Sequence, residues 1–164
     1  HANYCVPRVE LELAFILGAP LKGPGVTMLD VLRATEFVVP FIEIIDTRVD
    51  EPRQIYDTIA DNGAGAGIVL GGRPFHPRDL DLRMVPGILY RNTDIEETGL
   101  SCGVMGHPAN GVAWLANKLS TLGYALEPGQ MLLAGSFVRP VWAKIGDTIR
   151  ADFGDLGSLA ILFV

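Results

Sequence analysis

The sequence predicts an α+β fold in which many short strands form a mixed, layered β-sheet and about two helices accompany them. Most apolar segments are short and β-prone, and Gly- or Pro-rich stretches separate them. Only residues 28–34 and 108–122 carry the signals of a helix. Because no internal repeat or linker is evident, we expect residues 1–164 to form a single domain.

The first elements follow from local patterns. Residues 9–17 alternate and then become continuously apolar, which predicts a buried strand. Residues 18–25 are rich in Gly and Pro and predict a loop. Thr27, with Asp30 three positions later, forms an Asp variant of the capping box and predicts a helix over residues 28–34.

The middle of the chain predicts further strands. Residues 37–47 are β-prone, and Pro40 near their start indicates an edge strand or a bulge. The small residues of 61–67 are not typical of an ordinary strand or helix and indicate close backbone packing or approach to a ligand. Short strands are expected at 68–70 and 85–91.

The second helix and the last strands complete the prediction. Pro108 occupies a typical first helical position, apolar residues then recur at helical spacing, and Gly123 ends the segment. The last forty residues predict strands joined by Gly turns, at 130–137, 148–153 and 158–164.

Composition and charge exclude several classes of protein. The net charge of −6 argues against a nucleic-acid partner, which requires a basic face. No apolar run is long enough to span a bilayer, and no signal peptide is evident. The two cysteines are expected to be reduced thiols, so a cytoplasmic protein without a membrane partner is the expectation.

Two glutamates in the first strand are the first candidate site. Glu10 and Glu12 are two positions apart, so they point to the same face of a strand whose other face is apolar. Like charges beside a core repel and lose hydration, and a cation or a bound proton must compensate. The alternative is an amphipathic strand whose outer end carries two solvated glutamates.

Glu43 strengthens the case for a cation. It lies within the apolar segment 41–45, where a carboxylate is seldom buried without a partner. An arginine such as Arg48 is one candidate partner, and a metal ion shared with Glu10 and Glu12 is the other. Three carboxylates without His or Cys at ligand spacing favour a hard ion, Mg²⁺ or Mn²⁺.

Longer motifs resemble a known family. The similarity covers nearly all of the chain, from about Pro7 onward, and GHPANGVAWLANKL and GSFVRP are far more specific than Glu-x-Glu. The chain resembles the branch of the fumarylacetoacetate hydrolase superfamily that contains 2-hydroxydienoate hydratases and oxalocrotonate decarboxylases of bacterial aromatic catabolism. The segments that carry this resemblance include PRVELELAF, TMLDVLRAT, VVPFIEIIDTR, DTIADN and GDTIRADFGDLGS.

The resemblance implies a metal-dependent lyase. It implies that Glu10, Glu12 and Glu43 bind Mg²⁺ or Mn²⁺, within a layered β-sheet fold and a homo-oligomer built from pentamers. The implied reaction is addition of water to a 2-hydroxydiene or 2-oxo-alkene dicarboxylate, which converts 2-oxo-hept-4-ene-1,7-dioate to 4-hydroxy-2-oxoheptanedioate. The cation would polarise the 2-oxo group.

The sequence departs from the family in two places. Family members carry an N-terminal segment that supplies a lysine and an acid for proton transfer, and nothing here matches it. We therefore expect a catalytic, metal-binding domain that lacks this segment, and no proton-transfer residue is assigned. The connection between Arg48 and Tyr56 is also shorter than expected.

Three further residues are candidates for substrate binding. Asn62 is expected to bond the substrate or a metal-bound water, with a turn cap as the alternative. Ser136 ends a strand where the superfamily places a hydroxyl near the substrate carboxylate, and a plain strand-end hydroxyl is the alternative. Arg139 is a candidate for the distal carboxylate of a dicarboxylate, with a surface salt bridge as the alternative.

Two other functions remain open. The same fold and metal also suit decarboxylation of an oxalocrotonate-type acid or hydrolysis of a carbon–carbon bond. A non-catalytic metal-binding fragment is the second alternative, because the N-terminal segment is unmatched.

Overall fold

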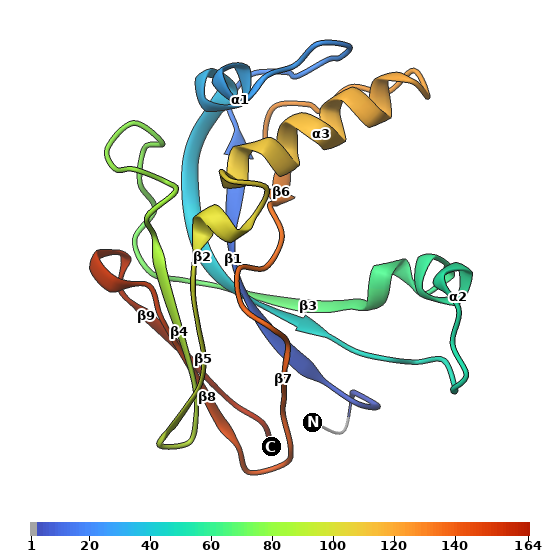
Figure 1. Ribbon diagram of the computed structural model, residues 1–164, viewed down its shortest axis with the longest axis vertical. Coiled ribbons are helices and arrows are strands. Elements are labelled where there is room, and N and C mark those ends of the chain that lie inside the picture. The colour runs from blue at the N-terminus through green and yellow to red at the C-terminus, as the bar shows by residue number, and fades with distance from the viewer. Residues whose placement is uncertain (1–2) are drawn as a thin grey trace.

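The structure, a computed structural model, describes residues 3–164 and contains two antiparallel sheets with three α-helices (Figure 1). The first sheet has the order β3-β2-β1-β6, and β7 also pairs with β1. Its strands are β1 (Arg8–Leu17), β2 (Thr35–Ile45), β3 (Gly65–Leu70), β6 (Met131–Leu133) and β7 (Val141–Trp142).

The second sheet has the order β5-β4-β8-β9. It consists of β4 (Pro86–Arg91), β5 (Asp94–Leu100), β8 (Thr148–Asp152) and β9 (Ser158–Leu162). The helices are α1 (Met28–Ala34), α2 (Ile55–Ala60) and α3 (Pro108–Ser120), with 3₁₀ turns at Asn62–Ala64, Ser101–Gly103 and Gly154–Leu156.

The α+β class with few helices is confirmed, but the strands pair differently from the expected mixed sheet. Every pairing between the described strands is antiparallel. Two of the three neighbouring pairs in the second sheet are joined by short connections: a tight turn after Arg91 links β4 to β5, and residues 153–157 link β8 to β9. Short turns can join antiparallel strands, whereas parallel neighbours need a crossover of about a dozen residues or more.

The two sheets pack against each other through one apolar cluster. Leu11 and Phe15 of β1, together with Leu89 and Ile149 of the second sheet, are fully buried in this cluster. The alternation predicted for β1 is therefore confirmed, since the side chains between its glutamates face the core. Burial of this face holds β1 rigidly at the centre of the molecule.

The two helix starts predicted from sequence are confirmed. Asp30 N donates to Thr27 Oγ1 at 3.4 Å, and Thr27 N donates to Asp30 Oδ2 at 2.9 Å, which completes the capping box of α1. At α3, Pro108 is in the first turn and His107 Nδ1 accepts from Ala109 N at 3.1 Å. The two helices pack against each other beside the upper part of the first sheet (Figure 1).

The position of Pro40 differs from the expectation of an edge strand, because β2 lies between β1 and β3. Phe41 pairs with Leu70 at the end of β3, so the ladder on that side stops beside Pro40. The missing N–H of Pro40 therefore costs no hydrogen bond within the ladder, and its carbonyl still accepts from Gly71 N at 3.4 Å.

The small-residue segment 61–67 combines two structures. Asn62, Gly63 and Ala64 have positive φ angles in a 3₁₀ turn, as expected for an irregular segment. Gly65–Gly67, however, begin β3 and pair with the end of β2, which corrects the expectation that no ordinary strand occurs there. Because β3 is an edge strand, this pairing positions the turn at Asn62–Ala64 at the edge of the first sheet.

The cap of α1 predicts a measurable loss of stability. Thr27→Ala removes the side-chain acceptor for Asp30 N and is expected to lower the free energy of unfolding by about 1 kcal/mol. Urea denaturation followed by circular dichroism measures the change. Thr93→Ala, at an exposed turn threonine, is the control and should change stability by no more than about 0.5 kcal/mol. Equal effects of the two substitutions would contradict the capping role.

Candidate metal centre

Three carboxylates from two neighbouring strands converge on one face of the first sheet. Glu10 of β1 pairs directly with Glu43 of β2, and Glu12 lies two residues further along β1. One oxygen from each side chain lies within 4.8 Å of the others. The structure thus brings together the three residues that the sequence predicted as metal ligands.

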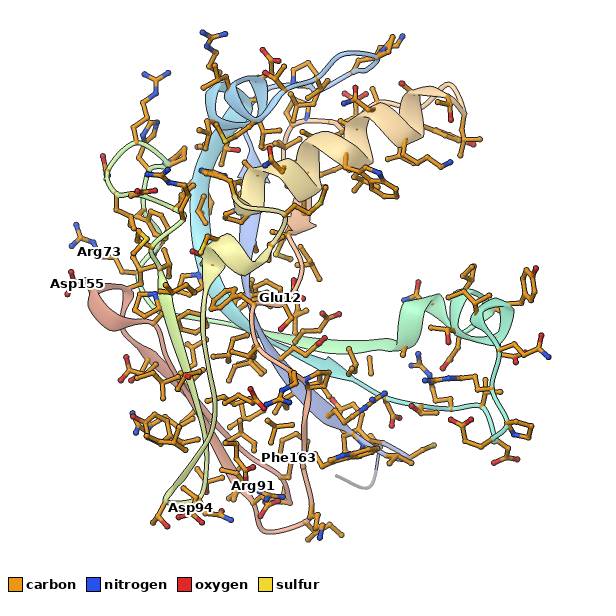
Figure 2. All side chains as sticks on the ribbon, in the orientation of Figure 1. Glu12, Arg73, Arg91, Asp94, Asp155 and Phe163 are labelled. Atoms are coloured by element: carbon orange, nitrogen blue, oxygen red, sulfur yellow. The ribbon has the colours of Figure 1, made fainter. Side chains whose placement is uncertain are left out.

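Glu12 is the most buried of the three, with only 3% of its surface exposed, while Glu10 and Glu43 are half-buried. It lies near the middle of the molecule (Figure 2). Gly135 N donates to Glu12 Oε2 at 2.9 Å and so fixes one carboxylate oxygen. The two residues are 123 positions apart, and no sequence pattern indicates this contact.

Burial and mutual repulsion alter the acidity of the cluster. Burial and the neighbouring charge of Glu43 raise the pKa of Glu10 to about 7, although Arg8 acts in the opposite direction. The same two causes raise the pKa of Glu12 to about 8, against the hydrogen bond from Gly135. Three ionised carboxylates at this spacing therefore need a cation.

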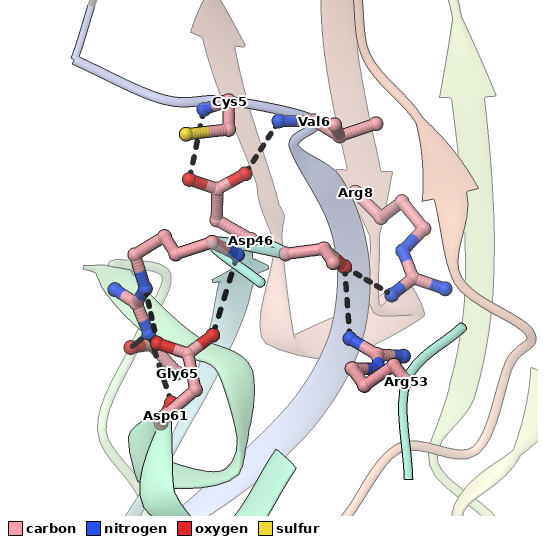
Figure 3. A network of polar contacts seen from close by, with 9 residues as sticks. Cys5, Val6, Arg8, Asp46, Arg53, Asp61 and Gly65 are labelled. Atoms are coloured by element: carbon pink, nitrogen blue, oxygen red, sulfur yellow. Dashed lines mark hydrogen bonds and ion pairs between the residues drawn. The ribbon is translucent and has the colours of Figure 1, made fainter. Parts of the chain in front are cut away.

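No arginine supplies that cation within residues 3–164. Arg48, the alternative partner of Glu43, instead forms an ion pair with Asp61, with its Nε 2.7 Å from Asp61 Oδ1. It also donates to Gly65 O at 3.1 Å. These bonds join the end of β2 to the start of β3 (Figure 3), so Arg48 supports the site without neutralising it.

The donor chemistry of the cluster fits a hard divalent ion. Carboxylate oxygens are the ligands that Mg²⁺ and Mn²⁺ prefer, and no His or Cys belongs to the group of acids found here. A pocket of about 420 Å³ opens beside Glu43, and residues 65–68, Asn62 and Leu133 line it. An ion at the carboxylates would therefore face a space large enough for a small ligand.

Asn62 is the one predicted substrate-binding residue that lines this pocket. A Cβ atom on Gly65 would lie 3.7 Å from Asn62 Nδ2 and 3.8 Å from Glu43 Oε1, so both side chains approach Gly65. These are ordinary van der Waals distances, so Gly65 lies in direct contact with both groups at the edge of the pocket.

Ser136 and Arg139 have local partners. Ser136 Oγ lies 2.9 Å from Val138 O and 3.3 Å from Leu11 O. Arg139 is 86% exposed, and its Nε lies 2.9 Å from Glu97 Oε1. Neither residue lines the pocket beside Glu43, and the surface salt bridge proposed as the alternative for Arg139 is present.

A second polar network fixes the strands that carry the glutamates (Figure 3). The buried Asp46 carboxylate accepts from Val6 N at 2.6 Å and from Cys5 N at 2.9 Å. It thereby ties the segment before β1 to the end of β2. These contacts give Asp46 a structural role.

The fold and the cluster together define a class of protein: an antiparallel, two-sheet α+β domain with three clustered carboxylates whose oxygens suit a divalent metal. No family model matches the sequence. Among residues 3–164, none of the helices has the length and apolar character needed to cross a bilayer.

Known proteins of one family are similar to this chain. It is 52% identical over 169 residues to the 2-oxo-hept-4-ene-1,7-dioate hydratase of Escherichia coli, which covers 99% of this chain and 63% of the relative. It is 40% identical to the 2-hydroxyhexa-2,4-dienoate hydratase of Comamonas testosteroni, over 99% of this chain and 62% of the relative. The chain thus spans a little over three fifths of the length of these relatives.

A solved structure gives the same result. The 4-oxalocrotonate decarboxylase from Pseudomonas putida G7, complexed with magnesium and adipate, superposes with a TM-score of 0.95 at 31% identity. The match covers 98% of this chain and 62% of that one. The chain belongs to the hydratase and decarboxylase family of the fumarylacetoacetate hydrolase type, as its motifs predicted.

The acidity of the cluster predicts how stability depends on pH when metal is removed. The folded protein holds protons on Glu10 and Glu12 up to pKa values of about 7 and 8, whereas the ordinary value is 4.5. The folded state therefore binds more protons than the unfolded state across this range, and the free energy of unfolding falls as pH rises. In chelator, the urea midpoint should be lower at pH 8.5 than at pH 6.5.

The pH window and the control separate this effect from others. Burial lowers the pKa of His107, which weakens the fold only as pH falls below about 6.5. A variant with both Glu10→Gln and Glu12→Gln lacks the two carboxyl protons that the folded protein releases in this range, and it should show a flatter pH dependence. A midpoint that rises from pH 6.5 to 8.5 in the unmodified protein would contradict the assignment.

Proposed function

We propose that this chain is the metal-binding, catalytic domain of a hydratase that adds water to a 2-oxo-alkene dicarboxylate. Glu10, Glu12 and Glu43 would hold Mg²⁺ or Mn²⁺. The observation that carries the proposal is the convergence of three half-buried or buried carboxylates that form no ion pair with an arginine of residues 3–164. The 52% identity to the Escherichia coli 2-oxo-hept-4-ene-1,7-dioate hydratase supports the substrate.

The cation, when bound, would supply a Lewis acid that polarises the 2-oxo group of the substrate. The residues of this chain would hold the cation and orient the ligand. Glu10 and Glu43 hold opposite sides of the site because they pair across β1 and β2. The Gly135 N–H orients Glu12, and supporting bonds of this kind strengthen a metal site. Asn62 is placed to orient a ligand in the pocket beside Glu43.

No residue of this chain is assigned to the proton transfer. The resemblance implies a lysine and an acid of an N-terminal segment for this step. The present chain spans 63% of the length of the Escherichia coli relative. Its own contribution is to bind the substrate, orient it and hold the metal.

Decarboxylation of an oxalocrotonate-type acid is the second candidate. The observation in its favour is the TM-score of 0.95 with the Pseudomonas putida decarboxylase, whose described complex holds magnesium and adipate. Both reactions begin with a 2-oxo acid at a divalent cation, so the fold alone does not distinguish them.

The metal proposal predicts a large effect of one isosteric substitution. Glu43→Gln keeps the size of the side chain but removes a charged ligand, and it should weaken Mg²⁺ or Mn²⁺ binding by about 100-fold or more. Isothermal titration calorimetry measures the affinity, and circular dichroism shows that the fold survives. Glu97→Gln, at a partly buried glutamate that pairs with Arg139 outside the cluster, is the matched control and should bind metal normally. Unchanged affinity in Glu43→Gln would remove the assignment.

The reaction proposal predicts a specific product. With Mg²⁺ and a 2-hydroxydiene dicarboxylate, the expected product is the 4-hydroxy-2-oxo dicarboxylate, identified by mass spectrometry as substrate plus one water. Release of CO₂ would favour the decarboxylase, and two smaller acids would favour a hydrolase. The assay is run on this chain and on a version that carries the family's N-terminal segment. A lack of turnover in both would reject the hydratase.

A further inference from the structure

A second pocket lies on the face of the first sheet that carries the carboxylates. Its volume is about 300 Å³, and it is lined by Val6, Arg8, Thr47, Glu51, Arg53 and Trp142. Arg8 and Glu10 are two positions apart on β1, so their side chains point to the same face and their Cα atoms are about 7 Å apart. The pocket therefore adjoins the candidate metal centre.

Arg8 is held in place by an aromatic ring. It pairs across the strands with Trp142 of β7, and its guanidinium lies 5.0 Å from the centroid of that ring. A cation over the face of an indole is stabilised there, and the contact restricts the rotamers of the long side chain. Arg8 is thus prepared to act as a fixed cation.

Thr47 connects two guanidinium groups. Its Oγ1 accepts from Arg8 at 3.3 Å and from Arg53 at 3.1 Å, as Figure 3 shows. A hydroxyl oxygen has two acceptor sites and one hydrogen to donate. Both acceptor sites are taken, and the hydroxyl hydrogen has no acceptor within residues 3–164.

The two cations have no carboxylate partner of their own. Arg8 and Arg53 form no ion pair within the described part of the chain, whereas Arg48 and Arg139 do. Arg8 Nε is also buried without an acceptor. The one carboxylate that lines the pocket, Glu51, accepts from the backbone N of Arg53 at 2.7 Å. Two guanidinium groups and one carboxylate leave a net positive charge in the pocket.

We propose that Arg8, Arg53 and Thr47 bind the distal carboxylate of the substrate, while its 2-oxo acid end lies at Glu10, Glu12 and Glu43. This inference rests on the proposed function and identifies what selects a dicarboxylate. Guanidinium groups bind carboxylates through paired, charge-assisted hydrogen bonds, and the Thr47 hydroxyl adds a third donor. Arg139, the sequence-based candidate for this role, is paired with Glu97 instead.

The test compares two ligands that differ only in the distal group. 2-Oxoheptanedioate and 2-oxoheptanoate present the same 2-oxo acid, but only the first has a second carboxylate. Calorimetric titration of the Mg²⁺-loaded protein should show at least a tenfold preference for the dioate. Arg53→Gln should reduce that preference about tenfold and leave the affinity for 2-oxoheptanoate within about twofold.

Two more variants make the result decisive. Thr47→Val keeps the shape of the side chain and removes the hydroxyl, so it should also reduce the preference for the dioate. Arg139→Gln is the matched arginine control and should leave the preference intact. The inference is overturned if the unmodified protein shows no preference, if Arg53→Gln retains it, or if Arg139→Gln removes it.

A parallel titration in chelator tests the metal proposal separately. If Mg²⁺ strengthens the binding of both 2-oxo acids, the carboxylate cluster holds the ion, whatever the distal preference is. If Mg²⁺ changes neither affinity, the metal proposal is rejected. The effect of Arg53→Gln on the preference for the dioate still tests the proposal for the pocket.

Discussion

Repulsion among three carboxylates on one sheet face is the constraint on which the rest of this structure depends. Burial raises the cost of each charge, and the neighbouring acids raise it further, as the upward pKa shifts of Glu10 and Glu12 show. The fold must therefore hold the three carboxylates together against their mutual repulsion. The surrounding packing is therefore part of the site.

Strand register is what holds the acids together. Glu10 faces Glu43 because β1 and β2 pair over almost their whole lengths. A slip of one residue would turn the glutamates into the core and bring Leu11 to the open face. Two interactions oppose such a slip: the burial of the apolar face of β1, and the hydrogen bonds that Cys5 and Val6, just before β1, donate to Asp46 at the end of β2.

The sequence predicted those parts of the structure that depend on local chemistry. The capping box of α1, the proline at the start of α3 and the alternation of β1 all involve residues within a few positions of one another. Helix α2 was not predicted, because none of its residues is buried and no amphipathic pattern marks it. The all-antiparallel pairing was also missed, since it depends on contacts between distant segments.

The same distinction explains which site residues were predicted. Glu10, Glu12 and Glu43 were recognised because a charge among apolar neighbours is unusual in a sequence. Arg139 was placed at the substrate, but the structure pairs it with Glu97 of β5. Arg53 was not singled out, because its relation to the site depends on Thr47 and on the course of the loop after β2.

The face of the sheet that carries the site has an acidic cluster at one end and an unpaired arginine, Arg8, beside it. This arrangement of charges suits a dicarboxylate. The charge of Arg8 partly opposes the rise in the pKa of Glu10, yet its guanidinium is directed to Thr47 and Trp142 and forms no ion pair with a carboxylate among the described residues. The opposite charges therefore do not cancel. A 2-oxo monoacid would use only the cation held by the carboxylate cluster. A 2-oxo dicarboxylate would use that cation and also the arginine pocket. Keeping an unpaired arginine beside an acidic cluster costs stability, and a ligand that spans both charges would offset that cost.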